Sequence, residues 1–162
     1  MAVDPRLSDW RGLPALENLP TALADQLAQQ LQPMAAAQGT TLFDVGTSCQ
    51  ALPLVLEGRI RVSKRSETGR EISLYHVRAG ELCIVTLGCL LGSIPYPATG
   101  IAETPVQALV LPRPLFMTLL NAHPPFREWV FQLFTERITG LMQLIEAVAF
   151  QRRNTKRTKT HQ

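Results

Sequence analysis

The sequence predicts an α+β protein in which a compact β-roll is flanked by helices and followed by one long C-terminal helix. Three observations support this fold class. An amphipathic pattern begins at Pro20, short glycine-punctuated segments fill residues 40–111, and helical periodicity returns after Pro112. The chain has 162 residues, of which 46% are hydrophobic and 18% charged, so it can bury one ordinary core and is not disordered.

The first expected helix begins at Pro20, because proline is tolerated in the first helical turn. Four apolar residues then recur on one helical face, at spacings of 4, 4 and 3: Leu23, Leu27, Leu31 and Met34. We therefore expect this helix to end near residues 37–39. Residues 1–19 are expected to form an N-terminal extension.

Short strands are expected next, because apolar and polar residues alternate between glycines. The alternation is clearest over residues 56–62 and 71–77, and a further strand is expected over 106–111. Residues 66–69 are expected to form a hairpin turn between the first two strands.

Helical periodicity resumes after Pro112 as a short helix that stops at His123. A longer helix is expected over residues 126–150. Within it, a spacing of 4, 3, 4 and 3 links five apolar residues: Phe134, Ile138, Leu141, Ile145 and Val148. This spacing is typical of a coiled-coil seam, and other apolar residues lie off it, so we expect a dimerisation helix that contacts its own roll and a second chain. The alternative is one broad face buried within a monomer.

Residues 82–102 form a run of 21 uncharged residues, which is long enough to span a bilayer. Pro95 and Pro97 interrupt this run, together with three glycines. We therefore expect a buried strand-and-loop region rather than a membrane span.

The net charge of +3 is concentrated at the end of the sequence. Residues 151–162 hold five bases and no acid, whereas the rest of the chain holds 11 bases and 13 acids. This basic tail has no apolar residue, so we expect it to be disordered. It can contact phosphates non-specifically, but it cannot read a base sequence.

Short motifs with turn glycines recur in a fixed order along the chain. They are Phe43-x-x-Gly46, Leu54-Val55-Leu56-Glu57-Gly58-Arg59-Ile60-Arg61-Val62, Gly69-Arg70-Glu71-Ile72, Val77-x-x-Gly80-Glu81-Leu82, and Arg137 with Ala149-Phe150. Together they resemble the cyclic-nucleotide-binding domain and dimerisation helix of Crp/Fnr bacterial transcription regulators. The resemblance implies a cupin-like double-stranded jelly roll over residues 20–125 and a dimerisation helix over 126–150. It also implies that an effector binds between them, and that the helix pair transmits its presence to a helix-turn-helix.

The same resemblance implies an effector pocket, and its expected residues are Gly80, Glu81, Leu82, Cys83, Val85, Tyr96, Ala98, Leu141 and Met142. Cyclic-nucleotide binders of the family carry a second Gly-Glu pair for the ribose and an Arg for the phosphate. Here Ile84-Val85 and Tyr96-Pro97-Ala98 stand at those places, and no Lys or Arg occurs over residues 82–102. Because a buried phosphate without a cationic partner is costly, we expect that cyclic AMP is not bound in the usual way.

Two further residues of the long helix support this expectation. Leu141 and Met142 stand where cyclic-AMP binders carry hydroxyl residues for the base. We expect the pocket to take an uncharged effector or to be filled by the chain's own side chains.

Cysteine and histidine offer alternative sensing chemistry. Cys83 and Cys89 flank the expected pocket and are a candidate redox pair, although buried cysteines often serve only as small apolar residues. The first cysteine is Cys49, so the N-terminal cysteine group of an iron–sulfur sensor is missing. His76 lacks neighbours at ligand spacing, so we predict no metal site. No cofactor is assigned, and haem or another small effector stays open.

These observations indicate an effector-sensing, dimerising domain of a Crp/Fnr-type regulator. Its expected partner is a second copy, or a full-length relative in a heterodimer. A helix-turn-helix domain needs about 60–80 residues. Since twelve follow Phe150, we expect no sequence-specific DNA binding by this chain alone. The alternatives are a ligand-free interaction module, with a pocket packed by Ile84, Val85 and Leu90, and a thiol or haem sensor.

The sequence contains no pattern typical of an enzyme. We find no nucleophile–base constellation, paired-carboxylate motif or phosphate loop, so we predict that the chain is not an enzyme. Three cysteines do not make a disulfide framework, and the N-terminus lacks the apolar core of a signal peptide. We therefore expect a cytoplasmic protein.

Overall fold

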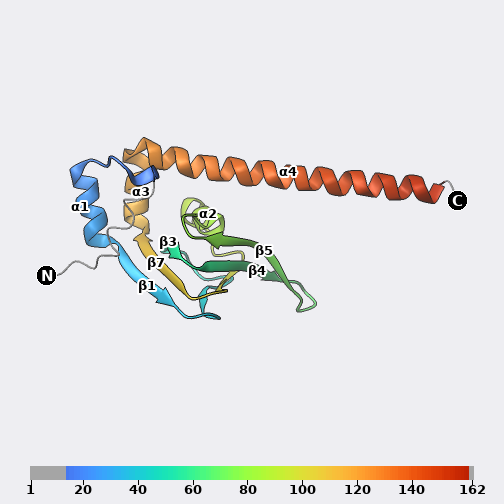
Figure 1. The fold of residues 1–162 in the computed structure, drawn as a ribbon, viewed down its shortest axis with the longest axis horizontal. Coiled ribbons are helices and arrows are strands. Elements are labelled where there is room, and N and C mark those ends of the chain that lie inside the picture. The colour runs from blue at the N-terminus through green and yellow to red at the C-terminus, as the bar shows by residue number, and fades with distance from the viewer. Residues whose placement is uncertain (1–13, 161–162) are drawn as a thin grey trace. The chain divides into compact units, whose positions relative to one another are not determined.

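The computed structural model describes residues 14–160 and the side chains of residues 15–158. The chain divides into two compact units, Met1–Arg127 and Glu128–Gln162. Figure 1 shows the order of the elements along the chain.

The first unit contains a β-roll made of two antiparallel sheets (Figure 1). The three-stranded sheet has the order β1-β7-β3, with β1 at Gln32–Ala36, β7 at Val106–Pro112 and β3 at Ala51–Glu57. The four-stranded sheet has the order β2-β6-β4-β5, with β2 at Thr41–Phe43, β6 at Thr99–Ala102, β4 at Arg59–Arg65 and β5 at Glu71–Arg78. The predicted fold class is thereby confirmed, as are the predicted strands over residues 71–77 and 106–111. The strand predicted over residues 56–62 is instead divided at Gly58 into the end of β3 and the start of β4.

Branched aliphatic side chains from both sheets form the core of the roll. The largest of those fully buried are Leu52 and Leu54 on β3, Ile60 on β4, and Leu109 and Leu111 on β7. Alternating burial along β4 and β7 explains why their sequences alternate between apolar and other residues.

Glycines allow the chain to turn between these strands. Positive φ values occur at all four turn glycines that the sequence analysis identified: Gly46, Gly58, Gly69 and Gly80. Gly58 is the most constrained, because its φ is +91° and an added Cβ would collide with the carbonyl oxygen of Pro105. The direct connection from β3 to β4 therefore requires glycine.

Two helices and a short 3₁₀ helix pack beside the roll. Helices α1 (Thr21–Gln30) and α3 (Arg113–Ala122) contact each other, and Leu27 and Leu119 are fully buried on them. The 3₁₀ helix η2 (Pro14–Leu16) buries Leu16, so the end of the expected N-terminal extension packs against the unit. The remainder of that extension, residues 1–13, lies outside the described residues.

The prediction that the first helix continues to residues 37–39 is wrong. Helix α1 ends at Gln30, and Met34 lies on β1, paired with Ala108 of β7. Pro33 accounts for the early end, since proline disfavours helical geometry at the residue before it. Strand β1 is an edge strand, where the missing N–H of proline is tolerated.

The prediction of strand and loop over residues 82–102 is wrong in its first half. Residues Ile84–Gly92 form helix α2, which buries Thr86, Leu87, Cys89 and Leu90. The helix-breaking Pro95 and Pro97 both follow α2, so they do not interrupt it. Among the described residues, no helix combines the length and the apolar content that a membrane crossing requires.

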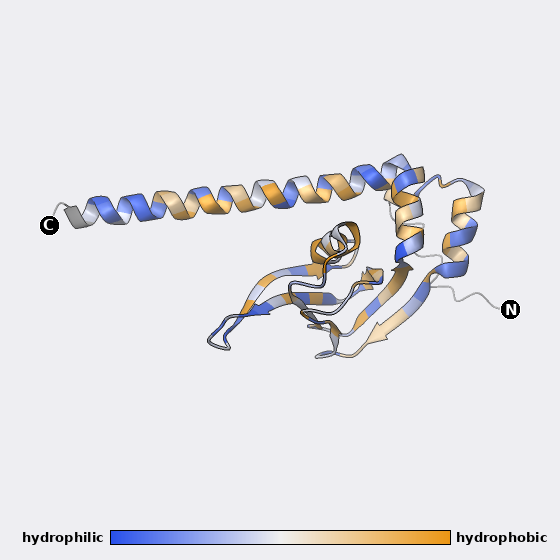
Figure 2. Cartoon of the chain, turned by 180° about the vertical axis from the view of Figure 1, so that it is seen from behind, coloured by the Kyte–Doolittle hydropathy of each residue, from blue (hydrophilic) through white to orange (hydrophobic). Residues whose placement is uncertain are grey.

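Helix α4 extends from Pro124 to Thr160, so its first turn lies in the first unit and the rest forms the second. The predicted long helix is confirmed, but the prediction that the basic tail is disordered is wrong up to Thr160; residues 161–162 lie outside the described part. No glycine or proline follows Gly140, and basic residues near a helix C-terminus interact favourably with the helix dipole. Figure 2 shows apolar residues along the middle of α4 and polar residues at its C-terminal end.

We expect Gly58→Ala to reduce the free energy of unfolding by about 2 kcal/mol or more, because alanine is strained at this φ and meets the Pro105 carbonyl. Chemical denaturation of the full chain measures this loss. Gly88→Ala is the matched control, since Gly88 is helical and its added Cβ has no atom within 4 Å. The control should keep or raise stability, and an equal loss in both variants would contradict the argument.

Candidate effector site

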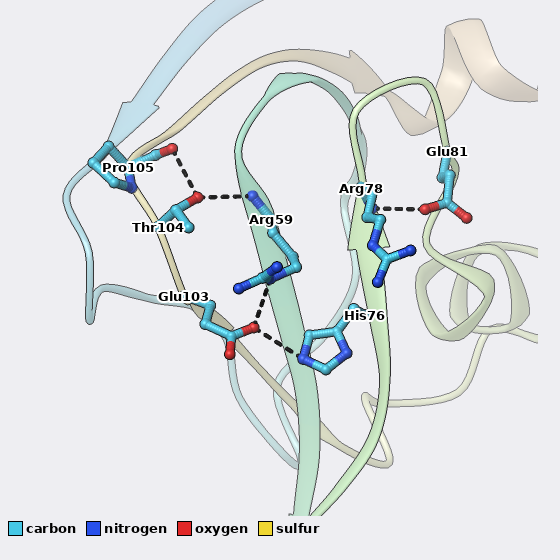
Figure 3. A network of polar contacts seen from close by, with 7 residues as sticks. All are labelled: Arg59, His76, Arg78, Glu81, Glu103, Thr104 and Pro105. Atoms are coloured by element: carbon cyan, nitrogen blue, oxygen red, sulfur yellow. Dashed lines mark hydrogen bonds and ion pairs between the residues drawn. The ribbon is translucent and has the colours of Figure 1, made fainter.

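The candidate site is built around helix α2, which follows the turn after β5. Gly80 N donates a hydrogen bond to Val55 O (3.0 Å), and Leu82 forms an isolated bridge with Leu54. The Glu81 carboxylate accepts a hydrogen bond from Arg78 N at 3.0 Å (Figure 3). Glu81 therefore stabilises its own exposed turn.

A tyrosine hydroxyl occupies the N-terminal end of α2. The backbone N–H of Val85 donates to the Tyr75 hydroxyl at 3.0 Å, and Cys83 Sγ lies 3.3 Å from the same oxygen. The first N–H groups of a helix have no partner within the helix and attract anions. Here a neutral phenol oxygen satisfies one of them.

Tyr96 lies inside the roll, with only 6% of its surface exposed. Its ring stacks on Phe43 of β2, with centroids 4.3 Å apart and an interplanar angle of 12°. Its hydroxyl accepts a hydrogen bond from Cys49 Sγ at 3.3 Å and lies 3.2 Å from Thr86 Oγ1 of α2. Burial, reinforced by the hydrogen bond with Cys49, raises the pKa of Tyr96 well above its ordinary value, so the phenol stays neutral.

Two small residues that follow Tyr96 are also closely packed. Ala98 is buried, and an added Cβ on Gly100 would collide with the Phe43 ring. The Phe43 ring therefore fills the space next to Gly100, while Phe43 and Tyr96 also line a partly open cavity of about 230 Å³.

The three cysteines are free and buried. Burial raises the pKa of Cys89 to about 11, and the neighbouring Cys49 and Cys83 add to this shift. Thiol reactivity requires the thiolate, so at neutral pH Cys89 behaves as a small apolar residue. Among the described side chains, no three His, Cys, Asp or Glu residues gather as a metal would require.

A charged cluster lies elsewhere on the four-stranded sheet (Figure 3). Glu103 Oε2 accepts from Arg59 Nε and lies 2.9 Å from His76 Nε2. Desolvation raises the pKa of Glu103, but the hydrogen bond and charge of Arg59, with the charges of His76 and Arg61, hold that pKa below its usual range. His76 is thus placed in an ion-pair cluster, where its nitrogen faces a carboxylate.

The structure brings some of the expected pocket residues together. Cys83 and Val85 lie at the start of α2 beside Tyr75, and Tyr96 contacts the same helix through Thr86. Leu141 and Met142 belong to the second unit, where both are exposed. The sequence analysis did not identify Phe43, Tyr75 or Thr86 as site residues, because only folding brings Tyr75 to α2 and brings Phe43 and Thr86 to Tyr96.

The fold and the site define a class of protein. The family model for the cyclic nucleotide-binding domain matches residues 33–123, more than half of the chain, so the chain belongs to this family. No curated protein sequence is significantly similar to it.

The solved structures similar to this chain include Crp/Fnr-type regulators. A protein described as a Crp/Fnr-family transcriptional regulator from Eubacterium rectale is 26% identical, with a TM-score of 0.71, over 82% of this chain and 62% of that one. The catabolite activator protein of Thermus thermophilus is 24% identical, with a TM-score of 0.70, over 85% of this chain and 63% of that one, and it supports the fold alone. This chain therefore spans about three fifths of each regulator.

Another similar protein is an enzyme. A cAMP-binding acyltransferase from Mycobacterium smegmatis is 27% identical, with a TM-score of 0.70, over 83% of this chain and 41% of that one. The domain class thus occurs in regulators and in an enzyme, and the absence of enzymatic activity in this chain stays a prediction.

We expect Tyr96→Phe and Thr86→Val each to lower the free energy of unfolding by about 1–2 kcal/mol, because each leaves a buried polar partner unsatisfied. The double variant should lose less than the sum, since removing both groups leaves fewer unmet hydrogen bonds. A double-mutant cycle by chemical denaturation measures the coupling. Thr118→Val on the exposed face of α3 is the control and should change stability by less than about 0.5 kcal/mol. If the losses of unfolding free energy in Tyr96→Phe and Thr86→Val add up to the loss in the double variant, the hydrogen bond between these two side chains is contradicted.

Proposed function

We propose that this chain is the dimerising sensor domain of a Crp/Fnr-type transcription regulator, and that its roll does not bind cyclic AMP in the usual way. The observation that carries this proposal is the buried, neutral Tyr96, which stands where the family's phosphate-binding arginine is expected. The proposal concerns the domain present in this chain.

The charges around α2 support this view of the pocket. No Lys or Arg occurs over residues 82–102. At the N-terminus of α2, the Tyr75 hydroxyl accepts the hydrogen bond from the backbone N–H of Val85. Arg113 hydrogen-bonds to Ser93 Oγ, at the C-terminal end of α2. A phosphate at the start of α2 would be desolvated without a cation from this segment, which is strongly unfavourable.

Exposed apolar residues along α4 support dimerisation. Leu141 is 59% exposed and Ile145 67% exposed, and Ile138 and Val148 are exposed at the same helical spacing. Covering such a stripe removes apolar surface from water, which yields about 25 cal/mol per Å². A second α4 in a coiled coil covers it with matching spacing.

A ligand-free interaction module is the second candidate function. It is favoured by the close packing of Phe43, Tyr96 and Gly100, and by the burial of Leu90 on α2. In that case the roll is a rigid scaffold, and the long helix pairs with a copy of itself or with a relative.

We expect no heat beyond dilution when cyclic AMP or cyclic GMP is titrated into the full chain, because the phosphate has no cationic partner in the segment that follows Glu81. Isothermal titration calorimetry makes this measurement, with a cyclic-AMP-binding member of the family as the positive control. Saturable heat with either nucleotide would overturn this view of the pocket. A thermal-shift screen of uncharged compounds separates the two candidates, since a ligand that binds the native state raises the unfolding midpoint.

We expect the chain to be a dimer at tens of micromolar, and Ile145→Glu to be a monomer, because the substitution brings two carboxylates together in an apolar seam. Light scattering measures the mass of each species. Gln143→Glu is the matched control, since position 143 lies on the opposite side of the helix from Ile145. A monomeric wild-type chain would refute dimerisation, as would equal loss of the dimer in both variants.

A further inference from the structure

The C-terminal part of α4 carries a dense group of positive charges on a helical frame. We call residues 151–158 the basic arm; its charged residues are Arg152, Arg153, Lys156 and Arg157, and all four are exposed. No acidic residue follows Glu146 in the sequence. The hydroxyls of Thr155 and Thr158 donate hydrogen bonds to carbonyl oxygens within the helix.

The basic arm continues the face of the apolar seam. Arg152 follows Ile145 by seven residues and Lys156 follows it by eleven, which are close to two and three helical turns. Arg153 and Arg157 lie next to them on one flank of the same face. The seam thus changes from apolar to cationic after Val148.

In a dimer, which is part of the proposed function on which this inference rests, the positive charges of the two arms come close together. If two α4 helices pair in parallel along the seam, Arg152 falls at a seam position and faces Arg152 of the other copy, while Lys156 lies on the flank of the seam. Like charges in a seam repel, so two paired helices diverge beyond Val148 and leave the two arms apart in solvent. Each arm then presents its bases outward to a polyanion.

The composition of the arm favours a nucleic acid over a membrane. Residues 151–162 contain no apolar residue, so this segment has no face to bury among lipid chains. Duplex DNA offers a dense line of phosphates, and its major groove is wide enough for an α-helix, whereas the major groove of an RNA duplex is too narrow.

We propose that the basic arm binds the phosphates of duplex DNA without reading the base sequence. Binding releases counterions, so affinity falls steeply as salt rises. In the dimer both diverging arms bind the same duplex, and the rolls do not contact the DNA.

Fluorescence anisotropy of the full chain with two labelled duplexes of unrelated sequence tests this proposal. We expect equal affinities, and a slope of log K against log salt of roughly −3 to −4 for each engaged arm. The variant Arg152→Gln/Arg153→Gln/Lys156→Gln/Arg157→Gln should lose about 100-fold or more in affinity at low salt and most of that slope. Circular dichroism checks that α4 keeps its helical content.

The matched control removes four exposed bases from the roll: Lys64→Gln/Arg65→Gln/Arg70→Gln/Arg78→Gln. Both quadruple variants have the same net charge, so retained binding in the control and lost binding in the arm variant locate the contact. Equal binding by the arm variant and wild type would overturn the proposal. So would a preference of about tenfold or more for one duplex, or tighter binding to phosphatidylserine vesicles than to DNA.

The monomeric variant Ile145→Glu separates this inference from the proposed function. It should still bind duplex DNA, with about half the salt slope of a dimer. Duplex binding that depends on the arm in a monomeric wild-type chain would refute dimerisation and support the DNA contact. A dimer that fails to bind duplex at low salt would refute the DNA contact alone.

Discussion

The insertion of Tyr96 into the roll joins elements that are distant in the sequence. Its ring stacks on Phe43 of β2, and its hydroxyl meets Thr86 of α2 and Cys49, which precedes β3. An aromatic stack contributes about 0.5–1.5 kcal/mol beyond its buried area, and each hydrogen bond about 1 kcal/mol. These contacts are directional, so they fix α2 against the sheet in a way that aliphatic packing alone does not.

The buried polar groups around Tyr96 and the start of α2 are uncharged. The phenol of Tyr96 is neutral, the Cys89 thiol is protonated at neutral pH, and a second phenol, Tyr75, meets the N-terminal end of α2. Charged groups gather instead around Glu103, on the four-stranded sheet, where water screens them. These groups therefore offer neutral hydrogen bonds rather than charges beside Tyr96.

Features with local signals were the most predictable from the sequence. The turn glycines and the alternating strands depend on neighbouring residues, so periodicity identified the roll. Two features were missed. Met34 fits a helical pattern but lies on β1, because tertiary pairing with Ala108 of β7 decides its conformation. Helix α2 was missed because its residues are nearly all apolar, so the sequence shows no alternation of apolar and polar residues with a helical period. In the site, Tyr96 was found as a departure from the family pattern. Its partners Phe43 and Thr86 were not, since they lie 53 and 10 residues away.

The continuity of α4 gives it a mechanical property. A helix of 37 residues is about 55 Å long at 1.5 Å per residue. The only prolines in α4 are Pro124 and Pro125 in its first turn, and no kink-forming proline follows. Such a rod behaves as a lever: one degree of tilt at its base displaces its far end by about 1 Å. A tilt of about five degrees therefore displaces that end by about one helical turn.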